Sequence, residues 1–175
     1  MSKLIVPPNN KDHIRGNIKG TVTLVEYGDF QCPSCGEAYP IVKEILKLKG
    51  DILKLIYRNF PLYQIHSNAL HAAYAAQVAG KQNKFWEMHD ILLENQENLE
   101  DKDLQQYAKD LSLDINQFTK DMESDQIAKK VEDDINGGIE SGVNGTPTFF
   151  INGISFDKNY ELDLLLEAID SVNKD

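Results

Sequence analysis

The sequence predicts an α/β fold in which a helical segment interrupts a small sheet. Three observations lead to this prediction. A strand, a helix and a second strand follow one another over residues 21–58, only helical patterns occur over 66–141, and a hairpin and a final helix close the chain. Consecutive strand, helix and strand imply a right-handed crossover and a parallel strand pair. A chain of 175 residues is long enough for one domain with its own core and an insertion.

The N-terminal third supplies the first strand, helix and strand. The first twenty residues are rich in Pro, Asn, Gly and Lys, which is typical of an irregular arm. Residues 21–27 are β-branched and apolar and predict a buried strand. Apolar residues recur at helical spacing over 34–49, and the apolar run 51–58 predicts the second strand.

The middle of the chain shows helical patterns only, so we expect a helical insertion over 66–141. An alanine-rich helix ends at Gly80, and helices over 84–93, 101–111 and 114–122 follow. The last two begin with an acidic residue suited to an N-cap. A final insertion helix over 127–139 is expected to fray at Gly137-Gly138.

Strand signals return near the C-terminus. Asn152-Gly153 separates two short apolar runs, which is a strong hairpin signal. Leucine, isoleucine and valine side chains then follow one face of a last helix. We therefore divide the chain into an N-terminal arm (1–20), a sheet-containing domain (21–65 and 142–175) and the helical insertion (66–141).

Composition excludes several classes of function. Lys and Arg total 18 against 28 Asp and Glu, which gives a net charge of −10. A surface this acidic repels phosphate backbones and anionic membranes. No apolar run approaches the roughly 18 residues that span a bilayer. The N-terminus lacks the apolar stretch of a secretory leader, so we expect a cytoplasmic protein, although a mature form with its leader trimmed would look similar.

The chain has two cysteines, in Gln31-Cys32-Pro33-Ser34-Cys35. This pair falls between the first strand and the first helix, where free amide groups and the helix dipole favour a thiolate on Cys32. The spacing places the Cys35 sulfur one turn away, within disulfide reach, and Pro33 suits a first-turn position that needs no amide donor. The pattern predicts a pair of cysteines for thiol–disulfide exchange.

A zinc site is the main alternative for a Cys-x-x-Cys pair. Zinc is usually held by four ligands, and the chain has no second pair of cysteines. The histidines at 13, 66, 71 and 89 show no finger-type spacing. We therefore expect no metal and no cofactor.

Three segments together resemble the DsbA-like branch of the thioredoxin superfamily. They are Glu26-Tyr27-Gly28-Asp29-Phe30-Gln31-Cys32-Pro33-Ser34-Cys35, Tyr57-Arg58-Asn59-Phe60-Pro61-Leu62, and Gly142-Val143-Asn144-Gly145-Thr146-Pro147-Thr148-Phe149-Phe150-Ile151-Asn152-Gly153. The resemblance runs from about residue 12 to the C-terminus. It implies a thioredoxin-like fold and thiol–disulfide oxidoreductase activity.

The resemblance also assigns further site residues. In the family a cis proline follows a residue that faces the sulfurs, and Thr146 and Pro147 match this motif. From the residues alone, a trans proline that opens a strand is favoured. A buried acid lies beneath the sulfurs in the family, and Glu26 matches it. Glu26 could exchange a proton with Cys35, and the alternative is an acid at a strand end that faces solvent.

Ser34 departs from the strongly oxidising family members, which have a histidine between the cysteines. A serine offers only a hydroxyl, and Glu26, Asp29 and Glu37 add negative charge nearby. We expect the helix terminus to prevail and to lower the Cys32 pKa modestly. The redox potential cannot be inherited from the family.

Other side chains are expected to be structural. We expect His66 and His71, at the start of the alanine-rich helix, to cap it or lie at the surface, with a role in the site as the less favoured alternative. Tyr57, Arg58 and Phe60 end the second strand, and we assign them no role in the site. The aromatic residues Phe85 and Trp86, with Met88, are expected to form the core of the insertion.

The leading hypothesis is a thiol–disulfide oxidoreductase acting on protein or peptide disulfides. Cys32 attacks and Cys35 resolves, with Glu26 as the third catalytic residue. Pro33, Ser34, Thr146 and Pro147 are expected to contact the substrate. Glutathione or a thioredoxin-type protein is a possible redox partner.

Two alternatives stay open. The first is a glutathione-dependent transferase or isomerase on the same scaffold, against which the second cysteine argues. The second is a non-enzymatic redox-sensing module whose insertion recruits a partner. The direction of electron flow also stays open, because a reducing cytosol would favour reductase or isomerase behaviour.

Overall fold

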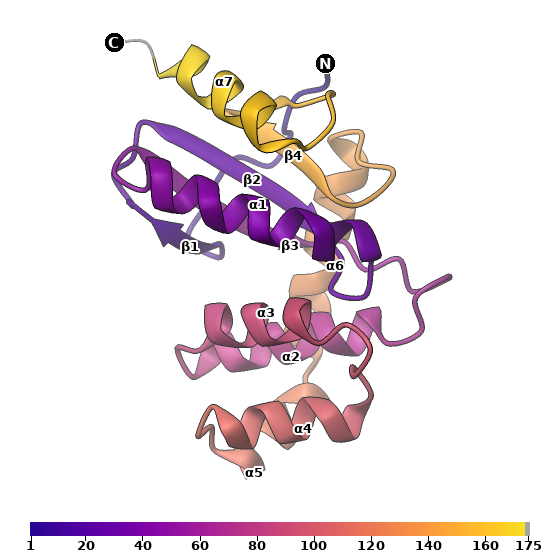
Figure 1. Cartoon of the computed structure of the whole chain (residues 1–175). Coiled ribbons are helices and arrows are strands. Elements are labelled where there is room, and N and C mark those ends of the chain that lie inside the picture. Colours follow the sequence, from indigo (N-terminus) through magenta and orange to yellow (C-terminus); the bar gives the residue numbers. More distant parts are fainter. Residues whose placement is uncertain (174–175) are drawn as a thin grey trace.

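The computed structural model describes residues 1–173 and places one mixed sheet between helices (Figure 1). The strands are β1 (His13–Gly16), β2 (Val22–Gly28), β3 (Leu53–Asn59), β4 (Thr148–Ile151) and β5 (Ile154–Ser155). The helices are α1 (Pro33–Lys49), α2 (Ala69–Lys81), α3 (Phe85–Glu94), α4 (Asp101–Asp110), α5 (Ile115–Met122), α6 (Asp125–Glu140) and α7 (Leu162–Val172). The predicted α/β fold with a helical insertion is confirmed.

The sheet has the strand order β1-β3-β2-β4-β5. β2 and β3 are parallel, as the strand–helix–strand pattern predicts, and β4 runs antiparallel to β2. Both central strands are buried on their two faces, because helices cover each side of the sheet. This burial explains why they appear in the sequence as nearly continuous apolar runs.

The N-terminal segment differs from the irregular arm that the sequence predicts. It contains β1, which pairs antiparallel with β3 at the edge of the sheet, and Ile14 packs against the core. A four-residue strand with one large apolar side chain shows too little periodicity to be recognised. Its stability comes from pairing with β3 and from Arg15, which forms an ion pair with Asp90 of α3 at 2.9 Å.

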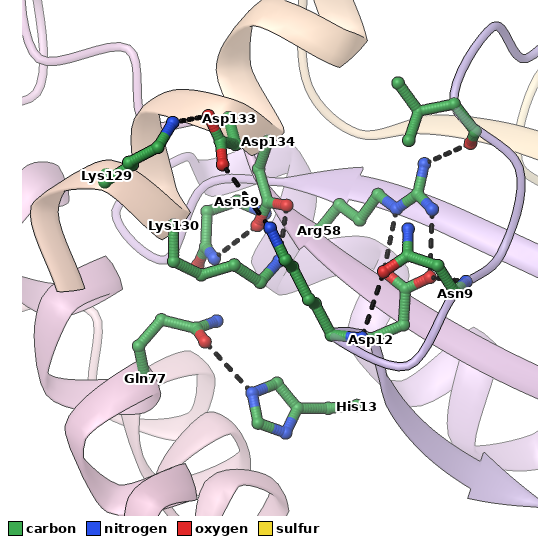
Figure 2. A network of polar contacts seen from close by, with 12 residues as sticks. Asn9, Asp12, His13, Arg58, Asn59, Gln77, Lys129, Lys130, Asp133 and Asp134 are labelled. Atoms are coloured by element: carbon green, nitrogen blue, oxygen red, sulfur yellow. Dashed lines mark hydrogen bonds and ion pairs between the residues drawn. The ribbon is translucent and has the colours of Figure 1, made fainter. Parts of the chain in front are cut away.

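A buried ion pair fixes the residues that precede β1 (Figure 2). The guanidinium of Arg58 donates to both carboxylate oxygens of Asp12 at 2.9 Å, and each side chain is only 2% exposed. Arg58 also donates to the carbonyl oxygens of Val6 and Pro7. The structural role expected for Arg58 is therefore what the structure shows, and this role is to hold the N-terminal segment on the sheet.

α6 covers the face of the sheet opposite α1 and α7 (Figure 1). The predicted fraying at Gly137-Gly138 is wrong, because the helix continues to Glu140 and both glycines are buried. A Cβ atom at position 138 would lie 2.8 Å from the ring of Phe60. These glycines let the helix approach the sheet closely, and Asp134 fastens it further by accepting from the backbone and side-chain amides of Asn59.

The insertion helices α2 to α5 form a layer beyond the β1 edge, with α4 and α5 farthest from the sheet (Figure 1). Asp114 caps α5 as predicted, whereas α4 is capped one residue earlier than expected, by Glu100 in a capping box with Asp103. Phe85 and Met88 lie in the insertion core. That core is continuous with the side chains around Cys32 and Cys35, so the insertion packs directly behind the cysteines. No helix within residues 1–173 is long and apolar enough to cross a bilayer.

Candidate active site

The two cysteines lie at the start of α1. Cys32 is the N-cap residue, with Pro33 as the first helical residue, and the amides of Cys35 and Gly36 donate to the Cys32 carbonyl. Both cysteines are free thiols. Cys32 is 7% exposed and Cys35 is fully buried, while Pro33 is exposed beside them. Only the first sulfur is placed for attack on an incoming disulfide.

Several hydrogen bonds lower the pKa of Cys32 to about 5. The largest contribution is a hydrogen bond from the Cys35 thiol, and burial of Cys32 opposes it. The Thr146 hydroxyl and the backbone amides of Cys35 and Ser34 lower the pKa further. The pKa is thus lowered more than the sequence predicts, because donors aimed at the sulfur act at shorter range than the helix dipole.

Cys35 has the opposite environment. Burial raises its pKa well above the ordinary value, and its hydrogen bond to Cys32 and the charge of Glu26 act in the same direction. The Asp29 amide is a donor to the Cys35 sulfur, at 3.4 Å. At neutral pH the pair therefore consists of a Cys32 thiolate and a Cys35 thiol.

Glu26 lies in the buried middle of β2, opposite Tyr57 on β3 and Phe149 on β4. It is 3% exposed, and burial raises its pKa to about 8. The alternative, an acid at the strand end that faces solvent, is wrong because Glu26 is buried. Its charge acts on Cys35, which makes a proton exchange between the two groups chemically reasonable.

The loop before β4 lies against Cys32. The Thr146-Pro147 bond is cis, as the resemblance implies. The Cys32 thiol contacts the Thr146 carbonyl at 3.4 Å. The buried Thr146 hydroxyl has no other partner among the described residues, so it is free to donate to the Cys32 thiolate and lower its pKa. The structure therefore brings Cys32, Cys35, Thr146 and Pro147 together.

The sequence reasoning missed the part played by Asp29. Its carboxylate is buried and accepts from the amides of Gln31 and Leu62, and it contacts Nδ1 of His66 at 2.7 Å. His66 is therefore neither a helix cap nor a surface residue. The Asp29–Gln31 contact is a turn in which an aspartate accepts from an amide two residues ahead, and this local signal could have been read from the sequence.

Two other polar side chains, those of Gln96 and His71, have surroundings different from those of Asp29. The Gln96 amide donates to the carbonyl oxygens of Phe30 and Cys32 and so links the insertion to the cysteine loop. His71 forms an exposed pair with Asp101, which matches the expected surface position. Within residues 1–173 no cluster of three or more potential ligands is arranged to hold a metal ion.

A thiolate at a helix N-terminus, a buried second thiol and a facing proline loop on this sheet are the arrangement of a DsbA-like member of the thioredoxin superfamily. The family model described as thioredoxin matches residues 8–171. The chain therefore belongs to the thioredoxin family.

Solved structures agree with this assignment. A thioredoxin-like oxidoreductase from Silicibacter pomeroyi superposes with a TM-score of 0.86 at 26% identity, covering 95% of each chain. α-DsbA1 from Wolbachia pipientis superposes with a TM-score of 0.79 at 25% identity, covering 97% of this chain and 94% of that one.

Sequence relatives place the same domain in longer proteins. The Na⁺/H⁺ antiporter NhaA 1 of Salinispora arenicola is 43% identical over 169 residues. The match covers 96% of this chain and 26% of that protein. The chain thus spans about a quarter of the length of the curated relatives it matches.

Proposed function

We propose that the protein exchanges disulfides with protein or peptide substrates through the Cys32-Pro33-Ser34-Cys35 motif. The observation that carries this proposal is the contrast between the two sulfurs. Cys32 is 7% exposed and its pKa is lowered to about 5, whereas Cys35 is fully buried and its pKa is raised. The first is suited to attack and the second to resolution of the mixed disulfide.

The Thr146 backbone supports a substrate that binds in extended form. The ladder between β2 and β4 begins at Thr148, so Thr146 lies outside it. Its carbonyl faces Cys32, beside which Pro33 is exposed. An extended segment that carries the substrate cysteine would find free backbone groups next to the attacking sulfur. We assign Ser34 and Pro147 to the same contact surface.

The acidity of Cys32 favours oxidation of substrate thiols. A sulfur with a low pKa is a good leaving group, and hydrogen bonds that stabilise its thiolate stabilise the reduced pair. We therefore expect the Cys32–Cys35 pair to be more oxidising than the roughly −270 mV typical of thioredoxin. A redox titration against glutathione measures this potential, and a value below that of thioredoxin would reverse the proposed direction.

The function is tested with a disulfide-bonded peptide and the two cysteine variants. In a single turnover the reduced wild-type protein should reduce the peptide disulfide and become oxidised itself, Cys35→Ala should accumulate a mixed disulfide through Cys32, and Cys32→Ser should be inactive. Equal behaviour of both variants would contradict the assigned roles. The cytoplasmic location and a glutathione or thioredoxin partner, both expected from the sequence, stay predictions.

A further inference from the structure

Tyr57 has a buried hydroxyl that the fold does not use. The residue is 1% exposed, and its hydroxyl has no hydrogen-bond partner among the residues that the structure describes. Leaving a buried hydroxyl unpaired lowers stability, and phenylalanine would fill the same apolar space without this cost. A tyrosine at this position therefore calls for an explanation other than packing.

The hydroxyl lies over the end of β2, in the core cluster that also holds the resolving cysteine. A Cβ atom at position 28 would come within 2.7 Å of it, so Gly28 is what allows the phenol to lie over the end of β2. The next residue along the chain is Asp29, whose amide is 3.4 Å from the Cys35 sulfur. Tyr57 and Cys35 also share one buried core cluster.

Aromatic neighbours hold the phenol in place. The ring stacks on Phe30 with centroids 5.0 Å apart, and the ring of His89 meets it edge-on at 4.7 Å. A ring fixed on two sides keeps its hydroxyl in one position, which is the property needed of a group that stabilises charge during a reaction.

The ionisable groups around Tyr57 are acids, thiols and one histidine. Glu26 stands opposite it on β2, Asp29 and the two cysteines lie at the end of that strand and the start of α1, and His89 faces it from α3. Burial and the charges of Cys35, Glu26, Asp29 and Cys32 raise the Tyr57 pKa well above its usual value. The phenol therefore keeps its proton at neutral pH and acts as a hydrogen-bond donor only.

We propose that the Tyr57 hydroxyl donates a hydrogen bond to the Cys35 sulfur while that sulfur is a thiolate. In the resolving step, Cys35 gives its proton to Glu26, once that group has released its own, and attacks the Cys32 sulfur. The Cys32–Cys35 disulfide forms, the bond between Cys32 and the substrate sulfur breaks, and the substrate leaves as a thiolate. In this direction the cysteine pair is oxidised and the substrate disulfide is reduced. When the pair oxidises substrate thiols, the same steps run in reverse and Cys35 leaves as the thiolate. This inference rests on the proposed function, and it adds to the Asp29 amide a second donor for the buried thiolate.

The test is Tyr57→Phe, with Tyr27→Phe as the matched control. Tyr27 is equally buried, but its hydroxyl accepts a hydrogen bond from Arg58 on the other face of the sheet. Loss of a hydrogen bond to a charged group changes a rate or equilibrium constant by a factor of roughly 10 to 100. We expect Tyr57→Phe to slow resolution of the Cys32–peptide mixed disulfide by about tenfold or more, as measured by acid quenching. Tyr27→Phe should resolve it at the wild-type rate.

Two further measurements separate this role from a structural one. In a Cys32→Ser background, followed by thiolate absorbance, Tyr57→Phe should raise the Cys35 pKa by about one. The stability of Tyr57→Phe should equal or exceed that of the wild type, since an unpaired polar atom is removed. Wild-type resolution and an unchanged Cys35 pKa in Tyr57→Phe would overturn the inference. A wild-type protein that forms no mixed disulfide would instead overturn the proposed function.

Discussion

Replacing Glu26 by glutamine should make the protein more stable, and increasingly so as the pH rises. The carboxyl group is buried, and its pKa is raised from 4.5 to about 8. At a pH between these two values, Glu26 keeps its proton in the folded protein but has released it in the unfolded chain. The free energy of unfolding therefore falls as the pH increases, by about 1.4 kcal/mol for each pH unit.

The magnitude follows from the width of this pH window. A pH of 7 is about two and a half units above the Glu26 pKa in the unfolded chain, which corresponds to roughly 3 kcal/mol of lost stability. Above pH 8 the loss reaches its full value and no longer grows. Glutamine has nearly the same shape and never ionises, so it removes the loss while keeping a neutral polar group in place.

Urea denaturation of the wild type and Glu26→Gln at pH 5, 6, 7 and 8 measures the effect. We expect a small difference in stability at pH 5 that widens to roughly 3 kcal/mol by pH 7. All other titrating groups are shared, so they largely cancel in the difference. Two stability curves that stay parallel from pH 5 to pH 8 would show that Glu26 is not held protonated by burial.

Two further predictions concern the cysteines and the loop beside them. Alkylation of Cys32 by iodoacetamide should reach half its maximal rate near pH 5, and Cys35 should stay unreactive in the folded protein. A midpoint near the ordinary cysteine pKa of about 8.5 would contradict the hydrogen bonding described for Cys32. Asp29→Ala removes a buried carboxylate that makes three contacts, so it should lower the free energy of unfolding in urea by about 3 kcal/mol. The control Asp101→Ala removes one partner of an exposed pair and should change this free energy by less than about 0.5 kcal/mol.

The sequence allows prediction of those features that local pattern determines. β2 and β3 are apolar because both faces are covered, and the insertion helices show regular apolar spacing, so their positions agree with the structure within a few residues. The cysteine motif identifies the reactive sulfurs because its chemistry depends on short spacing along one turn. These features need no knowledge of distant contacts.

Other features depend on contacts between segments that are far apart in the sequence. The Asp29–His66 pair joins residues 37 positions apart, and nothing near His66 indicates its partner. β1 is recognisable only once β3 provides a strand to pair with. The pKa of Cys32 is lowered mainly by a hydrogen bond from the Cys35 thiol and further by a hydroxyl from residue 146. The sequence-based expectation counted only the helix terminus and the nearby charges, so the expected shift was too small.

Gly138→Ala tests the most direct error of this kind, the expectation that two glycines loosen the end of α6. As an isolated change in a helix, glycine to alanine is favourable by about 1 kcal/mol. In the structure, however, the new methyl would lie 2.8 Å from one carbon of the Phe60 ring and 3.0 Å from the Tyr27 ring. Both rings are buried, so they have little room to move, and overpacking of this kind costs about 1–3 kcal/mol. We expect a net loss of stability in urea for Gly138→Ala and a smaller effect for Gly137→Ala, whose nearest neighbour is a Val6 methyl at 3.0 Å. A Gly138→Ala protein more stable than the wild type would mean that α6 is not packed this closely on the sheet.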